Sequence, residues 1–270
     1  MKLIYKKGVH RPLTMGIQKV VGTDSDGFFG PKTEEAVKQF QKNNNLKESG
    51  IVADETLSAM LPLIEEKYKI LEVICCFEVG GPDYCKSAWG KKTKIYDGAG
   101  WNYGPMQHNK FGSLQLMKKK FGFENPDVWY GTPAGALGQM WFFEEEILKD
   151  AKDFAEKIWS PTPRTRLLLS DAHVQGGGVY PTKPPRLWDD WPFSKDLIPK
   201  IQEIYRKYQI KQAFVSCLSL VDSGGEMYAE LHPRSGVKKF LKDQLSRRRT
   251  AYHGTGVVHG EKYDLSEFGL

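Results

Sequence analysis

The chain has no stretch of apolar residues long enough to span a bilayer, and its 270 residues show no internal repeat and no low-complexity segment. Its N-terminal stretch MKLIYKKGVHRP contains lysines but lacks an apolar segment followed by a small-residue cleavage site, so we expect no signal peptide. The common nucleic-acid-binding motifs are also missing. These absences disfavour a membrane-inserted protein and a nucleic-acid-binding protein.

Cysteine is scarce, and its four positions show neither the spacing of a metal site nor the density of a disulfide-stabilised fold. Cys75 and Cys76 are adjacent within a helical pattern, which predicts buried thiols and synthesis in a reducing cytoplasm. The six histidines lack HExxH-type spacing, which disfavours a zinc amidase or peptidase. A cysteine peptidase based on Cys76 or Cys85 with His108 has no local signature to support it. We therefore expect no cofactor and no metal.

What is present is the composition of a globular protein, with 40% hydrophobic and 27% charged residues. The length allows one large domain or two smaller ones. A formal net charge of +6 favours a polyanionic partner such as nucleic acid, an anionic membrane face or an anionic cell wall.

The first sixty residues have the pattern of three short helices joined by turns. A helix is expected over residues 13–21, and a second follows in GFFGPKTEEAVKQFQKNNNL, where Pro31 suits an early helical position. A third follows the turn at Gly50, with Asp54 as a candidate N-cap. Because so small a unit leaves little room for catalytic machinery, we expect it to bind.

The segment DGFFGPKTEEAVKQFQKNNNLKESGIVADETLSAM resembles the three-helix peptidoglycan-binding domains found at the ends of cell-wall hydrolases. The resemblance covers about residues 5–62, although GVHRPLTMGIQKVV lacks the usual polar start of a helix. Most matched residues are of the kind that form the fold rather than contact sugar. The resemblance implies a peptidoglycan-binding domain over residues 1–62, followed by a second domain over residues 63–270.

The rest of the chain is helix-rich. Helices are expected in LIEEKYKILEVICCFE, which has an amphipathic pattern, and in TPAGALGQMWFFEEEILKDAKDFAEKIW, which begins near Thr132 and Pro133. Further helices are expected in RTRLLLSDAHVQ, SKDLIPKIQEIYRKYQ and GVKKFLKDQLSRRRTAY. Between Cys85 and Met106 the periodicity breaks, which predicts loops or a small hairpin. The expected fold class is mainly α, with a small three-helix domain and a larger helical domain that carries a small β or loop insertion.

One face of the helix expected in LIEEKYKILEVICCFE is apolar until it reaches Glu78. Ile64, Tyr68, Leu71 and Cys75 precede it at spacings of three or four residues. A carboxyl group against apolar surface loses hydration of its charged form, so its pKa rises. That property suits a general acid for glycosidic cleavage. The alternative is a solvated carboxylate at a frayed helix end.

A second carboxylate, Asp97, follows 19 residues later in the glycine-rich stretch DGAGWNYGPMQHN. Such a polar setting keeps an aspartate hydrated and ionised, and two carboxyl groups in contrasting environments are the minimal pair for hydrolysing a sugar–sugar bond. Beside it, Trp101 and Tyr103 are candidates for packing on sugar rings. An ordinary surface turn is the alternative.

A helix-terminal glutamate followed by Asp-Gly-x-Gly-x-x-x-Gly, here Asp97 to Gly104, resembles the chitosanases of the lysozyme superfamily. The resemblance implies that Glu78 is the general acid and Asp97 the base for an attacking water. Where the family has a hydroxyl residue that helps to hold this water, the chain has Asn102. The segment Gly-Pro-Met-Gln, which ends at Gln107, is similar to the Gly-x-Met-Gln segment of lytic transglycosylases, which share the fold.

The helix expected in LLLSDAHVQGGG is also similar to one in the chitosanases. The resemblance implies that Asp171 joins buried arginines behind the catalytic glutamate. Arg247, Arg248 and Arg249 are the candidate partners, and we assign Arg248 to this role. A basic helix face in water is the alternative for each arginine.

Together these features predict a monomeric, modular cell-wall hydrolase that resembles a bacteriophage endolysin. Its binding domain would raise the effective concentration of a lysozyme-like glycosidase at bacterial peptidoglycan. It would be made in the host cytoplasm without a signal peptide and act on the wall after release. Chitosan hydrolysis and lytic transglycosylation are alternative activities, and a non-catalytic wall-binding protein is a more distant one.

Overall fold

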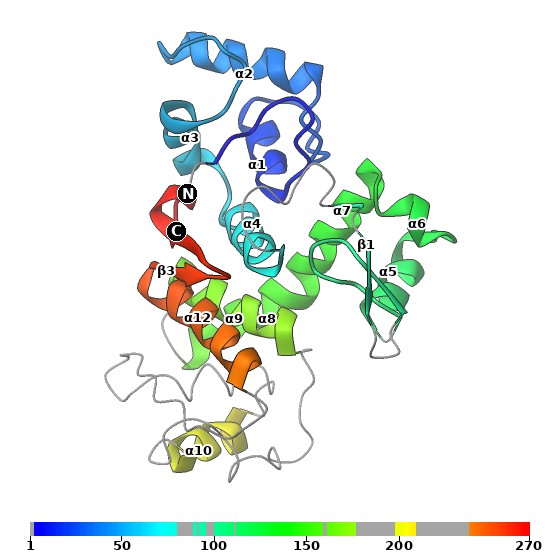
Figure 1. Ribbon diagram of the computed structural model, residues 1–270, viewed down its shortest axis with the longest axis vertical. Coiled ribbons are helices and arrows are strands. Elements are labelled where there is room, and N and C mark those ends of the chain that lie inside the picture. Colours follow the sequence, from blue (N-terminus) through cyan, green and yellow to red (C-terminus); the bar gives the residue numbers. More distant parts are fainter. Residues whose placement is uncertain are drawn as a thin grey trace. The chain divides into compact units, whose positions relative to one another are not determined.

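The computed structural model describes residues 3–79, 89–90, 92–95, 100–110, 112–158, 161–176, 198–208 and 238–270. These residues form a mainly helical protein with two small antiparallel sheets, which confirms the expected fold class (Figure 1). The chain divides into two compact units. The first comprises Met1–Glu146 with Ser266–Leu270, and the second comprises Ile147–Leu265. None of the described helices is long and apolar enough to cross a membrane.

The first unit begins with the three expected helices, α1 (Pro12–Val20), α2 (Pro31–Asn43) and α3 (Asp54–Met60), and a short 3-10 helix, η1 (Leu61–Leu63), follows. Pro31 opens α2 as predicted, because its fixed φ suits the first helical turn and its missing N–H is not needed there. The N-cap of α3 is Ala53 rather than Asp54, which is the first helical residue.

Buried Gln18, in α1, holds the turn that precedes α2. Its side-chain oxygen accepts from the backbone N–H of Gly27 at 2.8 Å. Its NH₂ group donates to the carbonyl of Phe28 at 3.1 Å and to the hydroxyl of Thr33 at 3.2 Å. The turn's polar backbone groups are therefore paired inside the domain, where an unpaired group would be destabilising.

Gln41 repeats this arrangement one helix later, 23 residues after Gln18. Both side chains bind partners that lie 9, 10 and 15 residues further along the chain. The partners of Gln41 are Gly50, Ile51 and Thr56. The expectation that the chain has no internal repeat is therefore wrong for this segment, which contains two equivalent helix-turn units.

Helix α4 (Glu66–Val79) is buried on all sides rather than amphipathic, and every residue from Tyr68 to Phe77 is buried. Its one buried acid, Glu72, forms an ion pair with Arg11, with 2.6 Å between Nη2 and Oε1. The Tyr5 hydroxyl and the Leu13 backbone N–H also donate to this carboxylate, each at 3.0 Å. Residues on both sides of position 62 thus belong to one compact unit. The division into a binding domain over residues 1–62 and a second domain over residues 63–270 stays a prediction.

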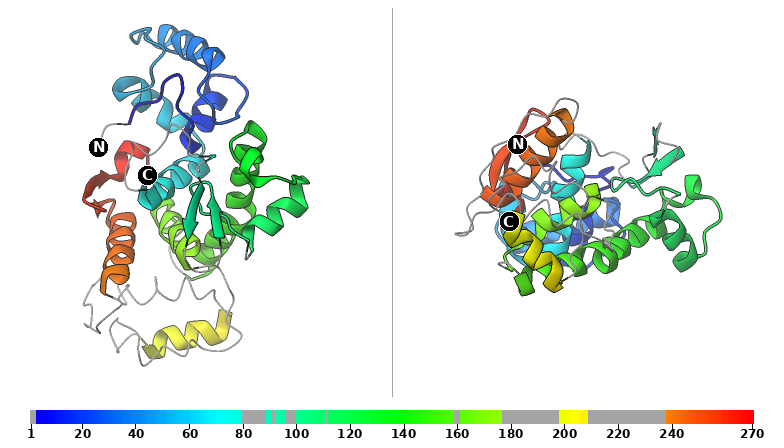
Figure 2. Two further views of the ribbon diagram at one scale, coloured as in Figure 1. Left: turned by 45° about the vertical axis from the view of Figure 1, so that its right-hand side comes forward. Right: turned by 90° about the horizontal axis from the view of Figure 1, so that it is seen from below.

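The remainder of the first unit holds a hairpin and a set of helices. Strands β1 (Lys92–Ile95) and β2 (Gly100–Tyr103) pair antiparallel and form the small hairpin that the break in periodicity predicts (Figure 2). Helices α5 (Ser113–Phe121), α6 (Pro126–Trp129) and α7 (Pro133–Phe142) follow. The Thr132 hydroxyl caps α7 by accepting from the N–H of Gly135. A π-helical segment, η3 (Phe143–Leu148), continues α7 as far as the second unit.

The second unit contains α8 (Lys149–Ile158), α9 (Pro163–Gly176), α10 (Ile198–Tyr208) and α12 (Lys238–His253). Helix α9 packs against α8 and α12, and α12 packs against the hairpin of β3 (Thr255–Val258) and β4 (Glu261–Asp264). The two turn residues, His259 and Gly260, have positive φ, as in a type I′ hairpin turn. The sequence did not lead us to expect this hairpin. A short 3-10 helix, η5 (Leu265–Phe268), ends the chain and returns it to the first unit.

Candidate active site

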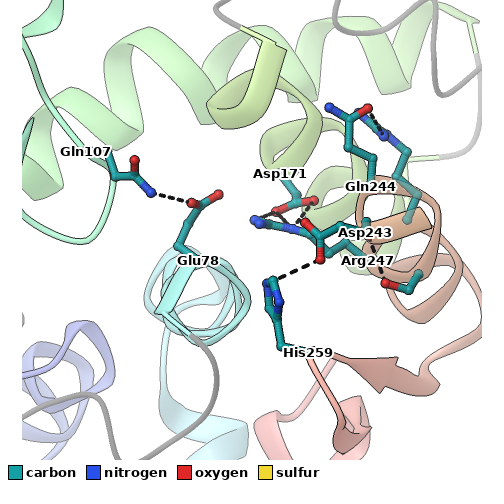
Figure 3. A network of polar contacts seen from close by, with 9 residues as sticks. Glu78, Gln107, Asp171, Asp243, Gln244, Arg247 and His259 are labelled. Atoms are coloured by element: carbon teal, nitrogen blue, oxygen red, sulfur yellow. Dashed lines mark hydrogen bonds and ion pairs between the residues drawn. The ribbon is translucent and has the colours of Figure 1, made fainter. Parts of the chain in front are cut away.

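Glu78 lies in the last turn of α4, at the point where the buried helix becomes partly exposed. Every residue from Ile70 to Phe77 is buried, so the carboxyl group stands at the end of a buried stretch of helix. Gln107 Nε2 donates a hydrogen bond of 2.8 Å to Glu78 Oε2 (Figure 3). A partly exposed carboxyl group held by an amide can exchange a proton with a ligand, which is the geometric requirement for a general acid.

A tight turn presents Gln107 to Glu78. The backbones of Tyr103 and His108 exchange two hydrogen bonds of 2.8 and 2.9 Å, which close the loop that contains Gln107. Gly104 opens this loop at φ 70°, and a Cβ there would overlap the side-chain oxygen of Gln139. Gln107 itself adopts φ 56°, a left-handed conformation that is uncommon for residues other than glycine. Local backbone strain of this kind occurs preferentially at functional sites.

Asn102 lies behind Gln107 on strand β2. Its side chain is 2% exposed, and its Nδ2 donates to Gln107 Oε1 at 3.1 Å. The expected role of Asn102 in holding the attacking water is therefore not supported, because its amide is buried and binds another side chain. Asn102, Gln107 and Glu78 form a chain of side-chain hydrogen bonds, which we call the amide relay.

The two aromatic residues of β2 have different surroundings. Tyr103 is buried, stacks on Tyr130 with ring centroids 5.1 Å apart and donates its hydroxyl to Asp127 at 2.8 Å. Burial, and then the hydrogen bond to Asp127, raise the pKa of Tyr103 to about 12. The prediction that Tyr103 packs on sugar rings is wrong, since its ring belongs to the protein core.

Trp101 remains a candidate for sugar packing. Its side chain is 43% exposed, and Lys92 Nζ lies 4.7 Å from the ring centroid. Lys92 is itself anchored, because it forms an ion pair of 3.0 Å with Asp127. The hydrogen bond from Lys92, and then the one from Tyr103, lower the pKa of Asp127. An exposed, anchored indole is suited to contact a carbohydrate, and its role stays a prediction.

Asp97, with Gly98 and Ala99, lies outside the described residues. The proposed base and its distance from Glu78 therefore stay predictions. Among the residues that the structure does describe, no group of three or more His, Cys, Asp or Glu side chains could hold a metal ion.

His108 is a buried residue beside the relay that the sequence did not single out as part of a glycosidase site. It is 1% exposed, and its ring meets Phe142 edge-on with 4.7 Å between centroids. Neither ring nitrogen has a hydrogen-bond partner among the residues described. Burial lowers the pKa of His108 to about 3, so the imidazole is neutral near pH 7. His108 therefore places a neutral, buried ring at the end of the turn that carries Gln107.

In the second unit, Asp171 pairs with Arg247 and not with Arg248 (Figure 3). Asp171 is fully buried, and Arg247 Nε lies 3.1 and 3.2 Å from its two carboxylate oxygens. Arg248 Nη1 donates instead to Gln244 at 2.9 Å. Successive helix residues point about 100° apart, so three consecutive arginines cannot all face α9. The assignment of Arg248 is therefore corrected to Arg247, while a role behind Glu78 stays a prediction.

A second polar contact links α12 to the hairpin beside it. His259 Nε2, in the turn between β3 and β4, lies 3.3 Å from Asp243 Oδ1. Both residues belong to the second unit, as do Asp171 and Arg247. Asp243 and Arg247 are four residues apart on α12, so both contacts lie on the same face of this helix.

Comparison with protein families matches residues 18–60 to the peptidoglycan binding domain. The match begins at Gln18 and ends at the last residue of α3, so it contains both glutamines and the turn residues that they bind. The chain therefore carries an N-terminal peptidoglycan-binding domain. A search of curated proteins found no match to the chain.

Proposed function

We propose that the protein is a cell-wall hydrolase of the endolysin type, which binds bacterial peptidoglycan and cleaves glycosidic bonds in its glycan strands. The observation that carries this proposal is the position of Glu78. This partly exposed carboxyl group ends a buried helix, is held by the Gln107 amide and belongs to the same compact unit as the peptidoglycan-binding domain.

In the proposed reaction, Glu78 donates its proton to the glycosidic oxygen. The bond between C1 and that oxygen then breaks, its electron pair stays with the leaving oxygen, and positive charge develops on the sugar ring. If Asp97 removes a proton from an attacking water, C1 gains a hydroxyl group and the product has a new reducing end. The exposed face of Trp101 would support a sugar ring near this centre.

Lytic transglycosylation is the second candidate, and the Gln107 contact favours it. The Gly-Pro-Met-Gln segment similar to that of transglycosylases places its last residue directly against Glu78. In that reaction a hydroxyl group of the muramic acid itself attacks C1, and the product is an anhydro sugar. Glu78 then acts first as acid and afterwards as base, so Asp97 is not needed.

The net charge of +6 supports a polyanionic wall polymer over cationic chitosan as the substrate. Binding through the N-terminal domain would raise the local concentration of glycan at Glu78. We propose that the protein is made in a bacterial cytoplasm during phage infection and reaches the wall after the membrane is breached.

The test uses the whole chain and purified peptidoglycan, with Glu78→Gln as the inactive variant. Glutamine keeps the size of the side chain but has no proton to donate to the leaving oxygen. We expect Glu78→Gln to sediment with insoluble walls as the unmodified chain does and to release no reducing or anhydro sugar ends. Glu124→Gln, at an exposed position, is the matched control and should remain active. Full activity of Glu78→Gln would refute the assignment of the acid.

A further inference from the structure

We propose that Trp89 is a positioning residue that fixes the turn over residues 104–107, which we call the active-site turn, against the peptidoglycan-binding domain. That domain then sets the position of the active-site turn, in addition to retaining the protein on the wall. The inference rests on the proposed role of Glu78, and all of its contacts lie within the first compact unit.

The ring of Trp89 lies against the peptidoglycan-binding domain. Its side chain is 0% exposed and is one of the largest fully buried side chains among the residues described. A Cβ at Gly27 would stand 2.7 Å from Trp89 Nε1 and 3.2 Å from Cε2, so the ring touches the backbone there. Gly27 belongs to the turn that Gln18 holds, because its N–H donates to that side chain at 2.8 Å. The indole is therefore seated on a turn within the family match over residues 18–60.

The backbone of Trp89 is bound to the helical part of the same unit. Gln139 Nε2, from α7, donates to the Trp89 carbonyl at 3.1 Å, and the Gln139 side chain is fully buried. The oxygen of the same amide lies against Gly104, where a Cβ would overlap it. A single buried amide thus contacts both Trp89 and the first residue of the active-site turn.

The active-site turn passes this position on to Glu78. The Gln107 N–H donates to the Gly104 carbonyl at 3.1 Å, and Gln107 Nε2 donates to Glu78 Oε2 at 2.8 Å. Close-packed interiors transmit displacements, because they contain little free space to absorb them. A shift of Trp89 would therefore move Gln139, then Gly104, and with it the amide that holds Glu78. Supporting groups of this kind determine how precisely a catalytic group is held.

Two features leave Trp89 little freedom to move away from Gly27. A Cβ at the next residue, Gly90, would stand 2.9 Å from the Cα of Gly131, so the chain already touches the turn between α6 and α7. Trp89 Nε1 is buried and has no hydrogen-bond partner among the residues described. Within the described part of the chain, packing rather than a hydrogen bond fixes the indole, so its position is sensitive to the side chain at residue 27.

The two helix-turn repeats supply a matched pair of variants, Gly27→Ala and Gly50→Ala. Gly27 and Gly50 have φ of 77° and 70°, so alanine introduces the same kind of backbone strain at both positions. At position 50 the added methyl group would meet Glu34 Cγ at 2.8 Å and Lys38 Cε at 3.1 Å, in side chains that are partly exposed and can move. At position 27 it would meet the buried ring of Trp89 instead.

The measurement is a nitrogen-15 NMR spectrum of the whole chain without substrate. The side-chain amide signal of Gln107 is identified by its absence in Gln107→Leu, and the indole signal of Trp89 by its absence in Trp89→Phe. We expect both signals to move in Gly27→Ala and to stay in place in Gly50→Ala. With soluble glycan fragments, which do not require retention on the wall, Gly27→Ala should lower kcat by about tenfold or more while KM changes little.

Trp89→Phe keeps the test valid if Gly27→Ala does not fold, because phenylalanine lacks the Nε1 atom that faces Gly27. The Gln107 amide signal should move in this variant. Trp141→Phe is its control, since Trp141 is partly exposed and its ring contacts Phe121, and this variant should leave the Gln107 signal in place.

A Gln107 signal that stays in place in both Gly27→Ala and Trp89→Phe would overturn the proposal. Equal movements in Gly27→Ala and Gly50→Ala, or an unchanged kcat in Gly27→Ala, would also overturn it. The spectrum needs no substrate, so it separates the positioning contacts from the activity. If the signals move as expected but Glu78→Gln still releases sugar ends, Trp89 positions the turn and the proposed function fails.

Discussion

Replacing Arg11 by methionine should strongly destabilise the first unit, because it leaves the Glu72 carboxylate buried without its positive partner. Arg11 is 3% exposed and Glu72 is 0% exposed, and the two charges are 2.6 Å apart. Removing one member of such a pair lowers the free energy of unfolding by roughly 3–5 kcal/mol. At about 2–4 °C per kcal/mol for a domain of this size, the melting temperature should fall by about 6–20 °C.

The chain offers a matched control in the ion pair of Lys19 with Glu65. The distance is similar, 2.9 Å, but the two side chains are 49% and 50% exposed. Water screens this pair, so Lys19→Met should lower the free energy of unfolding by no more than about 1 kcal/mol. Differential scanning calorimetry of the whole chain compares the two variants directly.

A double substitution separates the pair from its surroundings. Arg11→Met combined with Glu72→Leu removes both charges, and it should recover much of the stability lost in Arg11→Met alone. If Arg11→Met shifts the melting temperature no more than Lys19→Met does, the buried pair does not hold α4 to the peptidoglycan-binding domain. The same reasoning predicts that deleting residues 1–62 destabilises what remains, because Glu72 loses three partners at once.

Three further outcomes follow from the described contacts. Asp171→Asn should lower the melting temperature by several degrees, because Arg247 keeps a buried charge without its counter-charge; an unchanged value in calorimetry would place the pair outside the core. Burial lowers the pKa of His108 to about 3 in the folded chain, against about 6.5 in the unfolded chain. The stability that His108 contributes is therefore complete above pH 6.5 and is lost as the pH falls, by up to about 1.4 kcal/mol per pH unit. His108→Phe should therefore reduce the loss of stability between pH 6.5 and 5 in urea unfolding, and an identical pH dependence would contradict this. Trp101→Ala should weaken binding to soluble glycan fragments by about tenfold, which corresponds to roughly 1.4 kcal/mol, without changing stability.

Local signals in the sequence predicted most helices well. Pro31 and Thr132 mark helix starts by short-range chemistry, namely a fixed φ and a side-chain cap, and neither depends on the rest of the fold. The spacing that ends at Glu78 also identified where a buried helix becomes accessible. These features are decided within a few residues, so a sequence is enough to find them.

The errors concern polar groups whose partners are distant in sequence. Glu72 looks like a solvent-facing residue until Arg11 is known to lie against it, and so α4 was expected to be amphipathic. The choice between Arg247 and Arg248 depends on how α12 is rotated against α9, which no local pattern determines.

On strand β2, too, the sequence did not predict which side chains are buried, although the residues that pack around them are closer in sequence. Simple alternation would place neighbouring side chains on opposite faces, yet Asn102 and Tyr103 are both buried. The burial of these two residues was not predictable because it depends on the turn and helices packed around the hairpin.

Mass spectrometry of peptidoglycan digested by the whole chain tests the central claim most directly. The account predicts soluble fragments with newly formed reducing or anhydro sugar ends and intact peptide stems, and it predicts that Glu78→Gln produces none of them while still binding the wall. Fragments formed only by cleavage of peptide or amide bonds, or the same sugar ends from Glu78→Gln, would contradict it.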